Sequence, residues 1–318
     1  RLSSRLRRPG LRPGAPGAMV PAMPDDLRPE VPTPPAPARD FSAPSVFQPG
    51  HLLREARRQK SLPDQDVPTA CVLDPDGDLV RHLRRTGQGR PSPGWACYHT
   101  DLVEFTLPDG TVAGVVGSAV GAPFAVLVAE QLFASGCRFL VSITSAGRIA
   151  DLGAPPYLVL IDRALRDEGT SSHYMPPGLV MAAPDPALLG RVEAALRAAF
   201  PFQDGTAVHR GATWTTDAPY RETEAAIAYA RTCGALAVEM EAAALYALAA
   251  ARGLPIICIA HVTNTMGQEA GDDFEKGEAG GSLTALRAIG AAAEAFRLGA
   301  GHAAPGSPGA AHSRATQR

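Results

Sequence analysis

The 318-residue sequence lacks the features that define several large classes of protein. It contains no apolar run close to the roughly 20 residues that a membrane-spanning helix needs, so we expect no membrane partner. Its formal net charge is only −2, which gives no electrostatic reason to expect a nucleic-acid partner. The total length and a hydrophobic content of 45% instead predict a folded protein with a substantial core.

Cysteine and histidine show no pattern of a disulfide framework or a metal site. The five cysteines are scattered, odd in number, and never adopt the C-x-x-C spacing. The eight histidines likewise form no recognisable metal motif. We therefore expect reduced thiols, a cytoplasmic location, and neither a metal nor a cofactor.

Composition divides the chain into three parts. Residues 1–45 are rich in proline and arginine and poor in large apolar residues, so burial cannot offset their ordering entropy. We predict a disordered tail there and a second flexible tail over residues 299–318. Residues 46–298 are predicted to form a single domain.

Strand and helix patterns alternate in the first half of that domain. Thr111–Val120 is predicted to be a strand, a helix follows through Ser135, and Phe139–Thr144 is predicted to be a buried strand. This spacing is typical of a βαβ unit, in which the strands are parallel. Ligands of such sheets bind beyond the carboxyl ends of the strands. The segment Ser145–Arg148 is predicted to be a turn at that location.

Small residues make the Ser145–Arg148 turn suitable for close approach by a ligand. Ala146 and Gly147 leave the backbone accessible, and free amides together with the Ser145 hydroxyl could hold an anion or a sugar. A tight turn without a ligand is an equally good interpretation of these residues alone.

The same reading gives further elements along the chain. Strands are predicted at Ala70–Leu73, Trp95–Leu107, Tyr157–Asp162, Gly205–Arg210 and Ile256–Ala260. Helices are predicted at His51–Lys60, Pro186–Ala199 and from about Asp272 to Leu298, where the acids read more readily as a capping cluster.

The most informative helix is predicted from Glu239 to Arg252, ending at Gly253. It is rich in alanine and has acidic residues in its first turn. Glu239 and Glu241 are two residues apart and point in different directions around the axis. An ordinary acidic first turn explains them, and so does a carboxylate that binds paired hydroxyls of a small ligand.

Val238–Glu239–Met240–Glu241, followed by a helix of small residues, resembles the ribose-binding motif of the nucleoside phosphorylases of the purine and uridine phosphorylase superfamily. The resemblance extends over about residues 68–298. It implies an α/β fold, a three-layer α/β/α arrangement with a central mixed, partly parallel sheet. It also implies that Met240 packs on the sugar of a nucleoside and that Glu241 binds the ribose hydroxyls, with Glu239 in the same site.

The resemblance also implies roles for other residues and an oligomeric assembly. Ser145, Ala146 and Gly147 fall where the family contacts phosphate, sugar and base. The family assembles as dimers, trimers or hexamers, so we expect a homo-oligomer.

The uridine phosphorylase branch is the most similar. Its members carry a stretch like Asp167–Pro176, which places His173 at the substrate, and a loop over the base that corresponds to Trp214, Thr215 and Tyr220. Arg221 would read the base, although no glutamine stands beside it. Asn264 occupies the place of an aspartate in the purine enzymes, and its amide can hydrogen-bond but cannot act as a general acid. Arg221 and Asn264 are therefore the catalytic candidates, with a uridine-type substrate favoured.

The sequence departs from the family at its phosphate site. Gly77, Thr100 and Ser142 stand where three arginines are expected. Ser145 and Arg148 are our candidates for phosphate binding, and Arg81, Arg84 and Arg166 could also substitute.

Three functions follow from this departure. The first is phosphorolysis of a nucleoside to free base and ribose 1-phosphate, with inorganic phosphate as the co-substrate. The second is hydrolysis, with Asp74 or Asp76 as the base that activates water. The third is a protein that binds nucleosides without catalysis.

Overall fold

A computed structural model gives the fold of residues 39–41, 43–177, 180–201, 205–265 and 276–301. The expected tails at 1–45 and 299–318 lie mostly outside these residues, and so does the acidic pair Asp272 and Asp273. Within them, the last helix continues through Gly301. No helix in the described ranges is long and apolar enough to span a bilayer.

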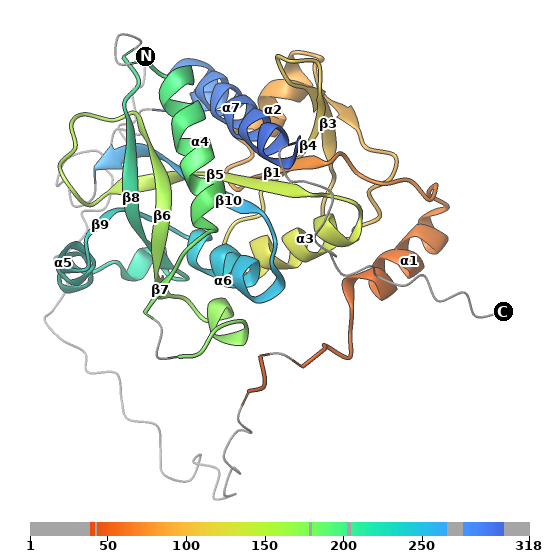
Figure 1. Ribbon diagram of the computed structural model, residues 1–318, viewed down its shortest axis with the longest axis horizontal. Helices are drawn as coiled ribbons and strands as arrows, with labels where there is room; N and C mark the ends of the chain where they lie inside the picture. Colours follow the sequence, from red (N-terminus) through yellow and green to blue (C-terminus); the bar gives the residue numbers. More distant parts are fainter. Residues whose placement is uncertain (1–38, 42, 178–179, 202–204, 266–275, 302–318) are drawn as a thin grey trace, which may run out of the picture. The chain divides into compact units, whose positions relative to one another are not determined.

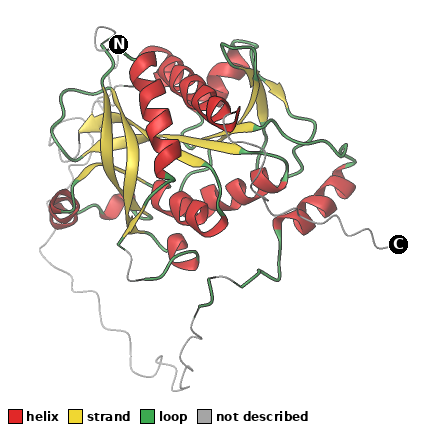
Figure 2. Cartoon of the chain, in the orientation of Figure 1, coloured by secondary structure: helices red, strands yellow, loops and turns green. Residues whose placement is uncertain are grey.

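Strands and helices alternate along most of the described chain (Figures 1 and 2). The strands are β1 (Ala70–Asp74), β2 (Arg90–Pro91), β3 (Val103–Thr106), β4 (Val112–Gly117), β5 (Phe139–Arg148), β6 (Tyr157–Asp167), β7 (Met181–Ala182), β8 (Val208–Thr216), β9 (Ala235–Glu239) and β10 (Ile256–Thr265). The helices are α1 (Pro49–Lys60), α2 (Asp78–Arg85), α3 (Ala122–Ala134), α4 (Pro186–Ala199), α5 (Glu224–Thr232), α6 (Ala242–Arg252) and α7 (Ser282–Gly301). Short 3₁₀ turns are η2 (Thr170–His173), η4 (Pro219–Arg221) and η5 (Glu278–Gly281).

The strands form one mixed sheet in the order β10-β6-β8-β9-β5-β1-β4-β3-β2, with β7 beside β6. Strand β10 also pairs with β5, so β5, β10, β6, β8 and β9 close into a ring. Strand β5 lies parallel to both β1 and β10, whereas β9 pairs with it antiparallel. The carboxyl ends of β1, β5 and β10 therefore meet at one edge.

Helices cover both faces of the sheet (Figure 1). Alternate residues of β5 illustrate the reason: Phe139, Val141 and Ile143 pack with α4 and α7, whereas Leu140 packs with α3 and α6. Side chains that alternate between two apolar layers need cover on both sides. The predicted three-layer α/β/α fold with a mixed, partly parallel sheet is confirmed.

Two predicted boundaries at the ligand-facing edge are wrong. Strand β5 continues through Arg148, because Gly147 and Arg148 pair with β9 and with β10 on either side. The expected Ser145–Arg148 turn is therefore strand. Likewise, Glu239 ends strand β9, and helix α6 begins only at Ala242.

Other strands differ in extent. Strand β8 runs from Val208 to Thr216, so Trp214 and Thr215 lie in a strand and not in a loop. The region predicted as a strand from Trp95 contains only β3, from Val103 to Thr106.

Candidate nucleoside-binding site

Glu241 lies at the junction between β9 and α6, where the chain leaves the sheet edge and enters the helix. It is the residue just before the first helical residue, Ala242. Its side chain is 1% exposed, and one carboxylate oxygen accepts a hydrogen bond of 2.7 Å from the backbone N–H of Gly121. Gly121 precedes α3, so the carboxylate sits at the positive end of that helix, which favours a negative charge.

Glu239 holds this junction in place. One of its carboxylate oxygens accepts hydrogen bonds from the hydroxyls of Thr213 (3.0 Å) and Thr215 (2.5 Å) on β8. The other accepts from the backbone N–H groups of Glu241 and Ala242, both at 2.7 Å. Both oxygens of the buried Glu239 are therefore engaged by the protein, which makes this side chain a structural support for Glu241.

The second carboxylate oxygen of Glu241, Oε2, is buried and has no hydrogen-bond partner among the described residues. Burial, followed by the nearby charge of Glu239, raises the pKa of Glu241 to about 8, while the Gly121 amide and the Thr144 hydroxyl act in the opposite direction. An acceptor atom without a partner costs free energy, and a ligand hydroxyl would supply the missing donor.

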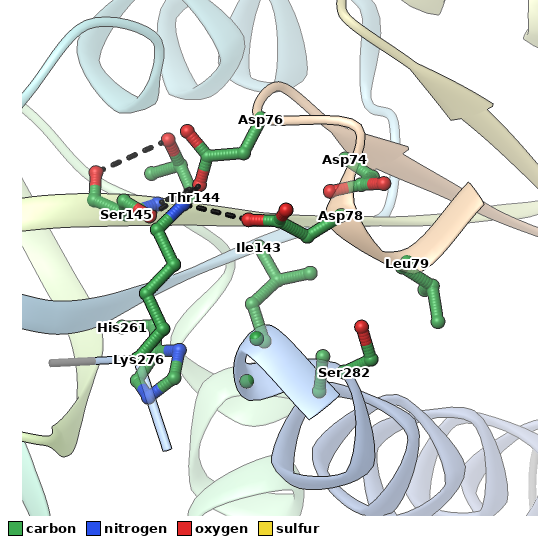
Figure 3. A pocket seen from close by; sticks show the side chains of 13 residues that line it. Asp74, Asp76, Asp78, Leu79, Ile143, Thr144, Ser145, His261, Lys276 and Ser282 are labelled. Atoms are coloured by element: carbon green, nitrogen blue, oxygen red, sulfur yellow. Dashed lines mark hydrogen bonds and ion pairs between the residues drawn. The ribbon is translucent and has the colours of Figure 1, made fainter. Parts of the chain in front are cut away.

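Asp76 reaches the same edge from the loop after β1. Its carboxylate accepts a hydrogen bond of 3.0 Å from the backbone N–H of Ser145 and a second from the Ser145 hydroxyl (Figure 3). These are two of the donors that the sequence predicts for a phosphate or a sugar. In this structure a carboxylate of the protein itself engages them.

A small pocket surrounds this contact. Lys276 enters it between two carboxylates, with its ammonium 2.6 Å from Asp78 and 3.6 Å from Asp76 (Figure 3). Burial, and next the charge of Lys276, lower the pKa of His261 to about 4, so this lining imidazole is neutral at pH 7. Burial also raises the pKa of the lining carboxyl of Asp74 to about 6.

The arginines considered for phosphate lie elsewhere or are paired. Arg148 donates to the Asp151 carboxylate (3.2 Å) and to the Gly153 carbonyl (2.7 Å). Arg166 donates to the Ser171 hydroxyl and to two carbonyls of the following segment, which it holds in place. Arg81 and Arg84 lie on α2, in contact with Asp78 and Asp101 respectively.

The three positions that hold arginine in the family have other roles here. Gly77 has a φ of +72°, in the left-handed region that favours glycine. The Thr100 hydroxyl accepts a hydrogen bond from the Trp95 indole N–H at 3.0 Å. The Ser142 hydroxyl is buried without a partner among the described residues.

The predicted base-side residues fall into two groups. Trp214 and Thr215 are buried in β8, where the Trp214 indole donates to Asp167 (2.9 Å) and the Thr215 hydroxyl contacts Glu239. Tyr220 is 99% exposed, and Arg221 is exposed beside it on η4.

His173 is exposed on η2. A hydrogen bond of 2.9 Å from the Gly169 amide to Asp217 ties the segment before η2 to the segment before η4. The two stretches predicted to face the base are therefore neighbours.

Asn264, Met240, Ala146 and Gly147 lie near the buried edge. Asn264 is half-buried on β10, in register with Gly147, which also pairs with Val238 of β9. Met240 is half-buried between β9 and α6, and Ala146 is buried in β5. The strand register thus brings Asn264 to the strands that carry Ser145 and the Glu239–Glu241 junction.

Sequence reasoning missed two groups that contact residues of the candidate site. Gly121 is not singled out by the sequence, although its amide donates a hydrogen bond to Glu241. Lys276 was not considered as a site residue, yet its ammonium lies against Asp76 and Asp78. No local pattern indicates either contact, because 120 residues separate Gly121 from Glu241 and 198 separate Asp78 from Lys276.

The chain belongs to the phosphorylase superfamily, whose pattern it matches over residues 70–294. It is 28% identical to a guanosine phosphorylase of Halorubrum lacusprofundi over 170 residues, which cover 52% of this chain and 68% of that protein. Its fold resembles the crystal structure of uridine phosphorylase from Vibrio fischeri ES114, with a TM-score of 0.56, 20% identity, and coverage of 73% of this chain and 94% of that one.

Proposed function

We propose that this protein cleaves the bond between ribose and base in a nucleoside by phosphorolysis, releasing the free base and ribose 1-phosphate. The observation that carries the proposal is Glu241, whose buried Oε2 lacks a partner among the described residues and lies at the edge where the strands end. A carboxylate there can accept hydrogen bonds from the ribose hydroxyls. Membership of the phosphorylase superfamily supports the same chemistry.

The reaction builds positive charge on the ribose ring and negative charge on the departing base. The ionised Glu241 would hold the ribose and oppose the positive charge, and burial strengthens that interaction. Asn264 would hydrogen-bond to the base as it leaves, because an amide can stabilise negative charge without transferring a proton. The bond from C1′ to the base nitrogen breaks as a phosphate oxygen bonds to C1′.

The identity of the base is a finer part of the proposal. Two relatives, one in sequence and one in fold, are a guanosine phosphorylase and a uridine phosphorylase. Asn264 has no titratable group with which to protonate a purine, so we favour a uridine-type substrate. Homo-oligomeric assembly and a cytoplasmic location stay predictions.

Hydrolysis is the second candidate, and a specific contact favours it. Asp76 lies on Ser145, where a phosphate dianion would meet its negative charge. A carboxylate at that place can instead take a proton from water as the water attacks C1′. Asp74 and Asp78 add carboxylates to the same pocket, and Lys276 brings a single ammonium.

The test is a panel of purine and pyrimidine nucleosides incubated with the full chain, with and without inorganic phosphate at constant ionic strength. Free base and ribose 1-phosphate are measured by chromatography. Base release that requires phosphate supports phosphorolysis. Release without phosphate supports hydrolysis, and nucleoside binding without release contradicts both catalytic proposals.

A further inference from the structure

A second pocket, of about 260 Å³, opens beside helix α2. Its lining comes from α2, from the end of β4 and from residues 99–101. The loop that carries Asp76 to Ser145 contributes Gly77 to this second pocket. Phe124, near the start of α3, completes the wall close to Gly121, whose amide binds Glu241. The pocket therefore adjoins the proposed ribose site.

Gly77 leaves room for two of the groups that line the pocket. A Cβ atom at Gly77 would lie 2.9 Å from a guanidinium nitrogen of Arg81 and 2.8 Å from the Ser118 hydroxyl. Any side chain there would displace one of the two. Glycine at this position thus allows a guanidinium from α2 and a hydroxyl from the end of β4 to lie together.

The charge of the lining is positive. It includes the guanidinium groups of Arg81 and Arg84 and a single carboxylate, that of Asp101. Arg84 contacts Asp101 at 3.1 Å, and Arg81 contacts Asp78 at 2.5 Å. Asp78 is shared, because Lys276 also binds it at 2.6 Å from the other pocket.

Both guanidinium groups can turn toward a ligand. The Arg81 and Arg84 side chains are 60% and 54% exposed, so their ion pairs are weak and exchangeable. Hydroxyls of Ser118 and Thr100 and the imidazole of His99 line the same space. Two guanidinium groups and hydroxyl donors that line one pocket match the oxygens of a phosphate group.

We propose that this pocket binds a phosphate group through Arg81 and Arg84. The group is either inorganic phosphate, the co-substrate, or the 5′-phosphate of a nucleotide. For inorganic phosphate the inference rests on the proposed phosphorolysis, and it explains how an anion binds although Asp76 engages the donors of Ser145. The lining of this pocket has two guanidinium groups and one carboxylate, whereas three carboxylates, those of Asp74, Asp76 and Asp78, line the pocket at Ser145.

Binding is tested without turnover by calorimetric titration of the full chain at constant ionic strength. The titrants are inorganic phosphate, a nucleoside 5′-monophosphate, and the same nucleoside without phosphate. Arg81→Gln and Arg84→Gln each remove one charge from the pocket. Arg85→Gln is the matched control, since Arg85 lies on the same helix but does not line the pocket.

We expect each of the two pocket variants to raise the Kd of a phosphate compound at least tenfold, with Arg85→Gln unchanged. If Arg81→Gln and Arg84→Gln raise the Kd of inorganic phosphate, the pocket is the co-substrate site. If they raise only the Kd of the monophosphate, the pocket is a nucleotide site. Unchanged binding in both variants, an equal loss in Arg85→Gln, or no binding of any phosphate compound overturns the proposal.

The same variants separate this inference from the proposed function. If phosphate-dependent base release occurs with unchanged phosphate KM in Arg81→Gln and Arg84→Gln, and neither variant weakens binding of the monophosphate, the pocket assignment fails and phosphorolysis stands. If phosphate binds in an arginine-dependent way but no nucleoside is cleaved, the pocket assignment stands and the proposed reaction fails.

Discussion

The carboxylate of Asp76 accepts two hydrogen bonds from Ser145, one from its backbone N–H at 3.0 Å and one from its hydroxyl. This contact places a negative charge at the carboxyl end of β5, where the superfamily resemblance implies a phosphate. The contact distinguishes phosphorolysis from hydrolysis. The carboxylate of Asp76 would repel a phosphate dianion, whereas it could take a proton from a water molecule that attacks the ribose.

Asp76→Asn removes the charge and keeps an acceptor for Ser145. If phosphate binds at Ser145, a repulsive charge next to it is gone and the KM for phosphate should fall about fivefold or more. If phosphate binds in the pocket of Arg81 and Arg84, the KM should change little. Initial rates at varied phosphate measure this. Asp151→Asn is the control, since Asp151 is an exposed carboxylate that contacts Arg148 and the backbone N–H of Gly153. Base release that proceeds without phosphate and disappears in Asp76→Asn would instead identify Asp76 as the base of a hydrolase.

Assayed at pH 9, above the raised pKa of about 8 at which Glu241 ionises, Glu241→Gln should lower kcat/KM for a ribonucleoside by about 10- to 150-fold. The reason is that a hydrogen bond to a charged group contributes roughly 1.5–3 kcal/mol. The loss should be smaller for the matching 2′-deoxynucleoside, which lacks one of the two hydroxyls. Steady-state kinetics on both substrates provide the comparison. Glu294→Gln, an exposed position on α7, is the control. An equal loss on both substrates would argue that Glu241 does not bind the 2′-hydroxyl.

The raised pKa of Glu241 predicts that the KM for the nucleoside depends on pH. Burial raises its pKa from 4.5 to about 8, so the carboxyl is mostly protonated at pH 7. Ribose hydroxyls bind best to the ionised form, and the KM for the nucleoside should therefore fall as pH rises through about 8. The Glu241→Gln variant should show no such step. A wild-type KM that is flat between pH 6 and 9 would contradict the assignment.

The same shift affects stability with a defined sign. A folded-state pKa above the unfolded value means that the folded protein binds the proton more tightly. The stabilisation from Glu241 is therefore complete below about pH 4.5 and is lost as pH rises through about 8. Chemical denaturation at several pH values should show a decrease across this window that is absent in Glu241→Gln. An unchanged slope in the variant would assign the decrease to other groups.

Glu239→Ala should destabilise the fold instead of acting on substrate binding alone. It leaves the hydroxyls of Thr213 and Thr215 and two backbone N–H groups without their acceptor. Unmet buried donors cost about 1–3 kcal/mol each, so a total of about 3 kcal/mol or more is expected. Thermal unfolding should show a Tm lower by roughly 6–12 °C. A Tm within about 2 °C of wild type would show that the junction does not depend on Glu239.

Arg148→Ala tests the phosphate role that the sequence suggested. Because the Arg148 guanidinium is engaged by Asp151 and by the Gly153 carbonyl, we expect the KM for phosphate to change by less than about twofold. Arg84→Gln should raise it by a larger factor in the same assay. A strong increase in the Arg148 variant would mean that this guanidinium reorients toward the anion.

Local periodicity was sufficient for most of the strands and helices, and the resemblance to the superfamily supplied their three-layer arrangement. The resemblance placed Glu241 in the site, and Asn264 was expected at the ligand-facing edge because it follows the predicted strand Ile256–Ala260. Local patterns failed at Glu239, which they assigned to a helix. An acidic residue before an alanine-rich segment can end a strand or begin a helix, and the local sequence does not distinguish the two. Here Glu239 ends a strand, where its carboxylate accepts hydrogen bonds from the threonine hydroxyls of β8.

Long-range partners were the other limit. Asp76 was considered as a base near the first strand, but its contact with Ser145 joins residues 69 apart in the chain. The same holds for Lys276, whose ammonium meets carboxylates from the other end of the domain. Local patterns cannot indicate such contacts, because they arise only when strand order brings β1, β5 and β10 together.

The most direct measurement is a crystal structure of the protein with a ribonucleoside bound. The account predicts that Oε2 of Glu241 accepts a hydrogen bond of 2.5–3.0 Å from a ribose 2′- or 3′-hydroxyl, with the base on the side of Asn264. A nucleoside bound elsewhere, or bound with its ribose out of reach of Glu241, would contradict it.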